Sequence, residues 1–351
     1  TPPPTPALTP HPLSSAASDV YKRQGLTGLT VAHNIGDIAQ AVVFEKSRGP
    51  GGRMATRRAP PFEFDHGAQF FSAGEPAFVT VVSSWQQAGV VKIWQPRYAE
   101  LDRGAVVAER AWDADHPHFV GTPGMNAIGR HLSSGLDVRL QTPVETVNPR
   151  GSGWQLIAAD GSDLGVFDWL IATAPATQAA ALLPESFAHH RALSDTQMQG
   201  CFALMLGFNQ PRQLPWQAAL VHNSDISWVS VNSSKPDRPA PFTLVAHSTG
   251  AFADAHMDEP LESLQQHLCA ELRDVTGIDA ENADFCQLHR WRYANIAARS
   301  GSAALIDADR RLAACGDWCI GGRVESAYSS AMSLAEYLRT VLPRTRPSSH
   351  D

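Results

Sequence analysis

A strand, a glycine-rich turn and a helix follow one another in ACGDWCIGGRVESAYSSAMSLA, residues 314–335. The apolar strand ends at Gly316-Asp317, and we expect the helix to begin at about Val324. The glycines of the turn let the backbone approach a ligand closely, and a helix start presents N–H groups and a partial positive charge. The Asp317 carboxylate can accept hydrogen bonds from ligand hydroxyl groups. The segment therefore predicts a ligand site, and an ordinary strand–turn–helix connection is the alternative.

A second segment of the same kind lies near the N-terminus, in AVVFEKSRGPGGRMATRR, residues 41–58. Its first half reads as a buried parallel strand that ends at Glu45, and GLTGLTVA at 25–32 reads as a helix start. Glu45 follows Gly25 by about 20 residues, which is the spacing of a dinucleotide-binding βαβ unit. We therefore expect Glu45 to bind ribose hydroxyl groups and Arg53 to lie beside a pyrophosphate.

The dinucleotide fingerprint is incomplete at its beginning. Gly25 and Gly28 fit its second and third glycines, but the first falls at Arg23. The residues before it contain no apolar run that could form a central parallel strand. We expect this strand and glycine to be lost or replaced, and we interpret residues 1–24 as a non-native-looking segment or a Pro-rich disordered tail.

The composition is that of a globular enzyme. The 351 residues are 43% hydrophobic and carry a formal net charge of −7, which argues against nucleic acid and anionic membranes as partners. No apolar run is long enough for a membrane span. Five scattered cysteines suit a reduced compartment, so we expect a cytoplasmic protein. We expect no metal site, because the histidine pairs at 116 and 118 and at 189 and 190 read as surface pairs.

Several motifs together resemble a known family. They are FEKSRGPGGRMATRR (44–58), FDHGAQFF (64–71), VGTPGM (120–125), WVSVNSSKPDR (228–238), HRWRYA (289–294) and the segment at Gly316-Asp317. Over roughly residues 25–340 the chain resembles the flavin-containing amine-oxidase superfamily. Within it, the chain is most similar to the renalase-like FAD-dependent oxidoreductases of bacteria.

The resemblance implies an α/β fold of two domains, a Rossmann-like FAD-binding domain and an inserted substrate domain on an antiparallel sheet. The expected FAD-binding domain comprises residues 25–75, 120–185 and 286–342. The expected substrate domain comprises residues 76–119 and 186–285, and residues 343–351 form a tail.

The resemblance also assigns residues to the site. It places on FAD the residues Gly25, Gly28, Glu45, Lys46, Gly52, Arg53, Met54, Gln69, Val144, Thr173, Gly316, Asp317 and Val324. Gln69 and His247 are candidates for contact with the reacting groups, and His66 beside them reads as a packed histidine. Candidates for the substrate cavity are Phe70, Trp228, Trp291, Arg292 and Tyr293.

The chemistry implied by the family is that of the cofactor, which accepts a hydride at N5 and is reoxidised by O2 to give H2O2. A renalase-like protein would oxidise a small-molecule substrate, a dihydro-NAD(P) isomer. The alternatives are a flavin-dependent amine oxidase or dehydrogenase acting on an amine, and a flavin-binding protein without catalysis.

Overall fold

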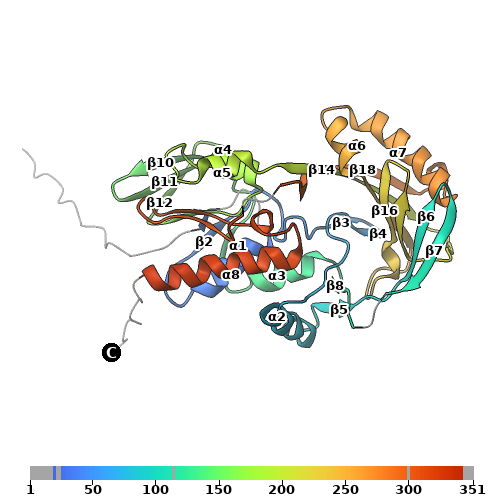
Figure 1. Cartoon of the computed structure of the whole chain (residues 1–351), viewed down its shortest axis with the longest axis horizontal. Coiled ribbons are helices and arrows are strands. Elements are labelled where there is room, and N and C mark those ends of the chain that lie inside the picture. The colour runs from blue at the N-terminus through green and yellow to red at the C-terminus, as the bar shows by residue number, and fades with distance from the viewer. Residues whose placement is uncertain (1–18, 21–24, 113–114, 299–300, 343–351) are drawn as a thin grey trace, which may run out of the picture.

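The computed structural model describes residues 19–20, 25–112, 115–298 and 301–342. The expectations for residues 1–18 and 21–24 and for the tail at 343–351 therefore concern residues outside the described part. Within it, an α/β half and a half built on a large sheet lie side by side (Figure 1). The expected fold class is confirmed.

The α/β half is built on short parallel strands. Strand β2 (Val42–Phe44) pairs in parallel with β9 (Asp137–Arg139), and β13 (Leu170–Ala172) pairs in parallel with β20 (Leu312–Ala314). Strands β2, β13 and β20 are short, fully buried apolar runs, as expected when helices cover both faces of a sheet, whereas β9 is largely exposed. Helix α1 (Leu26–Ile35) packs against α8 (Val324–Val341) on one face (Figure 1).

The N-terminal segment contains one strand that the sequence did not predict. Asp19–Val20 form β1, which pairs in parallel with Val43 and Phe44 of β2. The backbone of these two residues takes the place of the expected first strand, although they are not an apolar run. The expectation that residues 1–24 are entirely foreign to the fold is therefore wrong for Asp19–Val20, because backbone hydrogen bonds to β2 can form without apolar side chains.

The second half is a seven-stranded sheet of order β18-β14-β17-β16-β15-β6-β7. The strands are β18 (Phe285–Ile296), β14 (Met198–Phe208), β17 (Phe242–Ser248), β16 (Ile226–Val231), β15 (Ala218–His222), β6 (Arg97–Asp102) and β7 (Ala105–Ala111). All neighbouring pairs are antiparallel except β15 and β6, which are parallel. The expected antiparallel sheet is thus present with one parallel pair.

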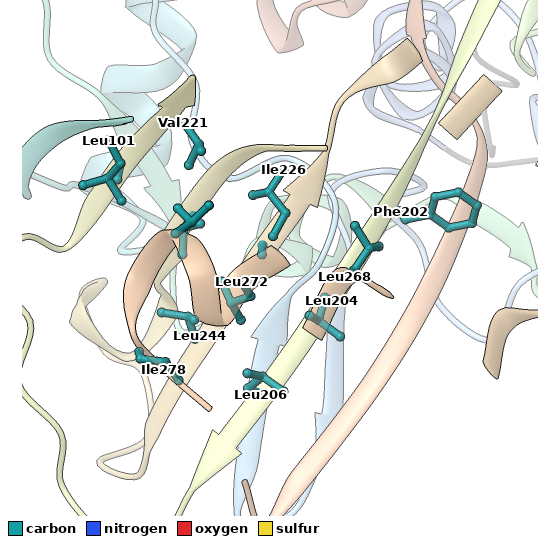
Figure 2. Close-up of a cluster of buried hydrophobic side chains, with 14 of the residues drawn as sticks. Leu101, Phe202, Leu204, Leu206, Val221, Ile226, Leu244, Leu268, Leu272 and Ile278 are labelled. Carbon is teal, nitrogen blue, oxygen red and sulfur yellow. The ribbon is translucent and has the colours of Figure 1, made fainter. Parts of the chain in front are cut away.

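Side-chain alternation divides β14 between two environments. Phe202, Leu204, Leu206 and Phe208 face helices α6 (Gly250–Ala255) and α7 (Leu261–Thr276), and form the largest core. Figure 2 shows leucines of β14 beside leucines of α7 in this core. The residues between them point to the opposite face. That face is turned toward the α/β half. Since side chains alternate between the two faces of a strand, only every second residue of β14 can reach a ligand bound there.

Two of the expected domain boundaries need correction. Strand β18 forms an edge of the seven-stranded sheet, so residues 286–296 belong with the half built on this sheet rather than with the α/β half, where they were expected. Helix α2 (Pro76–Gln87), expected in the substrate domain, packs its Phe78 ring 5.1 Å from the Tyr328 ring of α8. An aromatic side chain on the buried stripe of α2 thus attaches this helix to the α/β half.

The remaining elements connect these layers. They are the hairpin β3 (Thr56–Ala59) and β4 (Phe62–Asp65), the pair β5 (Val91–Ile93) and β8 (Phe119–Gly121), the meander β10 (Val144–Arg150), β11 (Gly153–Ala158) and β12 (Asp163–Phe167), strand β19 (Leu305–Asp307), helices α3 (Asn126–Ser133), α4 (Ala176–Leu182) and α5 (His190–Asp195), and the 3₁₀ turns η1 (Asn232–Ser234), η2 (Ala280–Asn282) and η3 (Asp317–Cys319). Among the helices of the described residues, none is both long and apolar enough to cross a membrane.

Candidate functional site

A cavity of about 570 Å³ lies between the two halves. Its lining comes from the start of α1, the 51–54 loop, the 67–72 loop, the start of α8 and the inner face of the large sheet. The predicted residues that it brings together are Gly25, Arg53, Met54, Gln69, Phe70, Thr173, His247, Trp291, Asp317 and Val324. Segments far apart in the sequence thus meet around one space.

One end of the cavity is suited to a phosphate-bearing ligand. Helix α1 begins after Gly25, which makes no side-chain cap, and within the described residues a Cβ on Gly25 would have no neighbour within 4 Å. The positive end of the helix dipole therefore lies at the cavity, where it favours an anion. Thr173 lines the same region, and its buried hydroxyl has no hydrogen-bond partner within the described residues. Because buried hydroxyl groups normally have a hydrogen-bond partner, the Thr173 hydroxyl is suited to a hydrogen bond with a ligand in the cavity.

The 314–335 segment forms the expected strand, turn and helix, although the strand ends two residues before Gly316. Strand β20 ends at Ala314, Asp317 opens the 3₁₀ turn, and α8 begins at Val324. The Asp317 main-chain oxygen accepts hydrogen bonds from Gly321 and Gly322, which closes the turn. The Asp317 carboxylate, which is almost buried, pairs through Oδ1 with Arg53 from the other glycine-rich segment. The two segments singled out in the sequence therefore contact each other directly.

The other end of the cavity is lined by the inner face of the sheet. Cys201 of β14 lies opposite Trp291 of β18, and His247 of β17 lies opposite Ala203 of β14. The Trp291 indole donates a 2.7 Å hydrogen bond to the His66 carbonyl, and the two rings stack at 5.2 Å. This end is thus a rigid wall with a flat aromatic surface.

The ionisable groups of this wall are uncharged at neutral pH. Burial lowers the pKa of His247 to about 4 and that of His66 to about 3, since a buried imidazolium loses its hydration. Burial likewise raises the pKa of the Cys201 thiol to about 12. These groups can donate or accept hydrogen bonds, but none of them carries a charge to a ligand.

Gln69 is held in one orientation at the cavity wall. Its Nε2 donates to the carbonyl oxygens of Asp65 at 2.5 Å and Gly67 at 3.0 Å. Its Oε1 accepts from the Ser230 hydroxyl at 2.8 Å and from Lys235 Nζ at 3.2 Å. Because donors surround the oxygen and acceptors surround the nitrogen, a flipped amide would lose these hydrogen bonds.

A fully buried cluster of charges lies behind Gln69. The Asp65 carboxylate lies 2.6 Å from the Arg238 guanidinium and 3.4 Å from Lys235 Nζ, and all three side chains are inaccessible to solvent. Asp65 also accepts hydrogen bonds from the Thr56 hydroxyl and from the Met125 backbone N–H at the start of α3. Asp65 and Lys235 lie in two of the motifs quoted above, at 64–71 and 228–238, but their contact was not predicted.

Other predicted residues lie outside the cavity lining. They are Gly28, Glu45, Lys46, Gly52, Val144, Gly316, Trp228, Arg292 and Tyr293. Glu45 directly follows strand β2, one residue from the predicted end, but it is buried and its Oε1 accepts a hydrogen bond from the Ser47 N–H. Trp228 lies behind Phe70, with ring centres 5.5 Å apart.

The assignment of Arg292 to the substrate is wrong. Its side chain is exposed and pairs with Asp258, because neighbouring residues on a strand face opposite sides of the sheet and Trp291 faces the cavity.

Some cavity residues were missed. Cys201 and Asn295 come from the inner face of the sheet, and Arg323 precedes α8. The alternation of β14 could have indicated Cys201, and Arg323 lies within the quoted segment 314–335, whereas Asn295 lies just after the motif at 289–294. Outside the cavity, Asp225, His267 and Glu271 bring possible metal-ligand atoms within 4.8 Å of one another, a grouping that the sequence analysis did not anticipate.

We expect Gly67→Ala to destabilise the chain by about 1–3 kcal/mol through overpacking. A Cβ at this position would lie 1.9 Å from the Arg53 carbonyl oxygen, and backbone cannot give way as a flexible side chain can. The 51–54 and 66–68 loops would have to separate, which also weakens cofactor binding. Urea unfolding of the apoprotein measures the first effect and a cofactor titration the second.

The matched control is Gly49→Ala, because a Cβ on Gly49 meets nothing within 4 Å. Its unfolding free energy should change by less than about 0.5 kcal/mol. Equal stability of the two variants would contradict the close contact between the loops.

Comparison with known proteins gives two family matches. Residues 97–339 match the family described as flavin containing amine oxidoreductase. Residues 25–84 match the family described as NAD(P)-binding Rossmann-like domain. The second match begins at Gly25, the first residue of the cavity lining.

Solved structures share the fold over nearly the whole chain. A protein from Exiguobacterium sp. that carries the name protoporphyrinogen oxidase is 15% identical, with a TM-score of 0.74 over 93% of this chain and 99% of that one. An oxidoreductase from Methanosarcina mazei is 13% identical, with a TM-score of 0.69 over 91% and 100%. Putrescine oxidase bound to putrescine is 12% identical, with a TM-score of 0.67 over 93% and 99%. At these identities the likeness shows the fold alone.

Proposed function

We propose that this chain, which belongs to the flavin containing amine oxidoreductase family, binds FAD and oxidises a dihydronicotinamide-type substrate. The family match supports a flavin-dependent oxidoreductase, and the choice of FAD and of the substrate is our proposal. A bound flavin would accept a hydride at N5 and would pass the electrons to O2, giving H2O2.

The residues present fit FAD along the length of the cavity. The start of α1 and Arg53 suit the pyrophosphate, and Asp317 suits the ribityl hydroxyl groups. The start of α8 at Val324 suits the ring, where its partial positive charge favours electron-rich states. The orphaned Thr173 hydroxyl offers one more hydrogen bond to the cofactor.

The observation that carries the substrate class is the chemistry of the sheet wall. It offers the flat ring of Trp291, the neutral His247 and the fixed Gln69, all of which suit a planar uncharged ring with an amide. Among the described residues that line the cavity, Asp317 is the one carboxylate, and it already pairs with Arg53. A cationic amine would therefore find no unengaged counter-charge there. Arg323, rather than Arg292, is the lining cation that could meet a substrate phosphate.

An amine oxidase or dehydrogenase is the second candidate, favoured by the family match itself. A flavin-binding protein without catalysis is the third. We also propose a reducing, cytoplasmic location, supported by the five cysteines, none of which forms a disulfide.

The test is an anaerobic absorbance spectrum of the purified holoprotein before and after adding dihydronicotinamide isomers. We expect rapid bleaching of the flavin with the isomers and none with simple amines. Bleaching with amines alone would replace the proposal by amine oxidation. A flavin that no substrate reduces would favour the non-catalytic alternative, and the absence of flavin after FAD addition would refute the cofactor proposal.

A further inference from the structure

The buried cluster of Asp65, Lys235 and Arg238 contains one carboxylate and two cations. All three side chains have no solvent exposure, and the Asp65 carboxylate contacts both cations. The other titratable group that faces Lys235 is His247, which is neutral at pH 7. Within the described residues the cluster therefore keeps one more positive than negative charge, and Lys235 Nζ also lies 5.4 Å from the centre of the Trp94 ring.

This arrangement is costly for a structural element. Burial of an ammonium group removes its hydration, and an apolar side chain of similar volume is often as stable or more stable in such a place. Burial lowers the pKa of Lys235 to about 8. The attraction of Asp65 acts in the opposite direction, because it favours the charged form of the lysine. The lysine is thus mostly charged at neutral pH in spite of its burial.

The cluster reaches the cavity through one side chain. Lys235 Nζ donates to Gln69 Oε1 at 3.2 Å, and Gln69 lines the cavity beside His247. The intervening Gln69 amide is neutral and buried, so the charge is screened far less than a surface charge would be. A group in the cavity that gains negative charge is therefore stabilised.

We propose that Lys235 is a positioning residue that fixes the Gln69 amide and, by its positive charge, raises the reduction potential of flavin bound in the cavity. The inference rests on the flavin site of the proposed function. Hydride transfer moves two electrons and one proton from the substrate to the ring, so the ring gains one negative charge while the substrate is oxidised. A nearby cation favours that product.

The test compares the two-electron potential of the FAD-loaded wild type with that of Lys235→Met, by equilibration with a reference dye. Asp65 keeps its contacts to Arg238 in this variant, so we expect the fold to persist. We expect the reduction equilibrium to shift toward the oxidised form by about tenfold, which is about 30 mV for a two-electron couple.

Two control variants separate charge from other effects. Lys92→Met removes the same charge from an exposed lysine that pairs with Asp237, and should leave the potential unchanged because water and salt screen it. Ser230→Ala removes the neutral donor to Gln69 and should shift the equilibrium far less than Lys235→Met. An equal shift in either control would overturn the assignment to the Lys235 charge.

The wild type alone gives an independent measurement, should Lys235→Met not fold. Above pH 8 the lysine loses its proton and its stabilisation of the anionic ring, so the potential should fall more steeply with pH there. Two neighbouring groups do not titrate in this range. The pKa of Asp65 is lowered, because the attraction of the two cations outweighs the effect of burial, and the pKa of His247 is about 4. A potential without this break, or one unchanged in Lys235→Met, overturns the inference. Absence of bound flavin instead refutes the proposed function, and the inference with it.

Discussion

Asp65→Asn is expected to destabilise the apoprotein by about 3–5 kcal/mol, the cost of breaking a buried ion pair by removing one partner. The substitution keeps the shape of the side chain but leaves the two buried cations without a counter-charge. Burial itself raises the pKa of Asp65, and the attraction of Lys235 and Arg238 outweighs it, so the folded state holds the carboxylate charged.

The position of Asp65 enlarges this effect. Its side chain accepts hydrogen bonds from the β3 residue Thr56 and from the backbone of Met125, and its counter-charges follow strand β16 of the large sheet. Arg238, held by Asp65, also donates to the Gly121 carbonyl beside α3. One carboxylate thus joins the two halves whose junction forms the cavity, so its loss should also weaken cofactor binding.

Urea unfolding with a matched control checks this prediction. Asp258→Asn breaks the exposed pair with Arg292 and should cost at most about 1 kcal/mol. The Asp65 contribution has a definite pH dependence, because its folded pKa is lowered. It is fully present above the unfolded value of about 3.9 and is lost as the pH falls through the folded value. Equal losses in the two variants would show that the cluster contributes no more than a surface pair.

The parts of the fold that could be predicted are those that local chemistry determines. An apolar run followed by glycines and a helix start can form only a few structures, and the start of α8 at Val324 is as predicted, whereas β20 ends at Ala314, two residues before Gly316. The same holds for β2, which ends just before Glu45. The family resemblance placed both segments on one cofactor, but the ion pair of Arg53 with Asp317 was not predicted.

The parts that could not be predicted depend on distant contacts. Lys235 lies in a Lys-Pro-Asp-Arg turn that is typical of the surface, and nothing local shows that Asp65, 170 positions earlier, will cover it. Arg292 shows an avoidable error, because Trp291 and Arg292 are neighbours on one strand and cannot both face the cavity. Strand β1 was missed for another reason. It is not an apolar run, and its position is set by backbone pairing with β2.

Asp317→Asn is expected to weaken FAD binding by about 10- to 100-fold, the equivalent of one hydrogen bond to a charged group. The carboxylate lies at the cavity wall and uses Oδ1 for Arg53, whereas Oδ2 has no hydrogen bond within the described residues. The amide that replaces it keeps the shape of the turn, because the turn is closed by the main-chain oxygen. Asparagine cannot offer a charged acceptor to ligand hydroxyl groups or attract Arg53 as strongly.

The measurement is a fluorescence titration of the apoprotein with FAD, together with urea unfolding without FAD. Asp309→Asn is the control, since this exposed aspartate in the turn between β19 and β20 lies outside the cavity lining. Arg53 is partly exposed, so water replaces its lost partner and the apoprotein should lose at most about 1 kcal/mol. A large loss of stability with unchanged affinity would mean that Asp317 holds the turn rather than the cofactor. The opposite pattern would establish the carboxylate as a cofactor ligand, because the fold then survives while the binding does not.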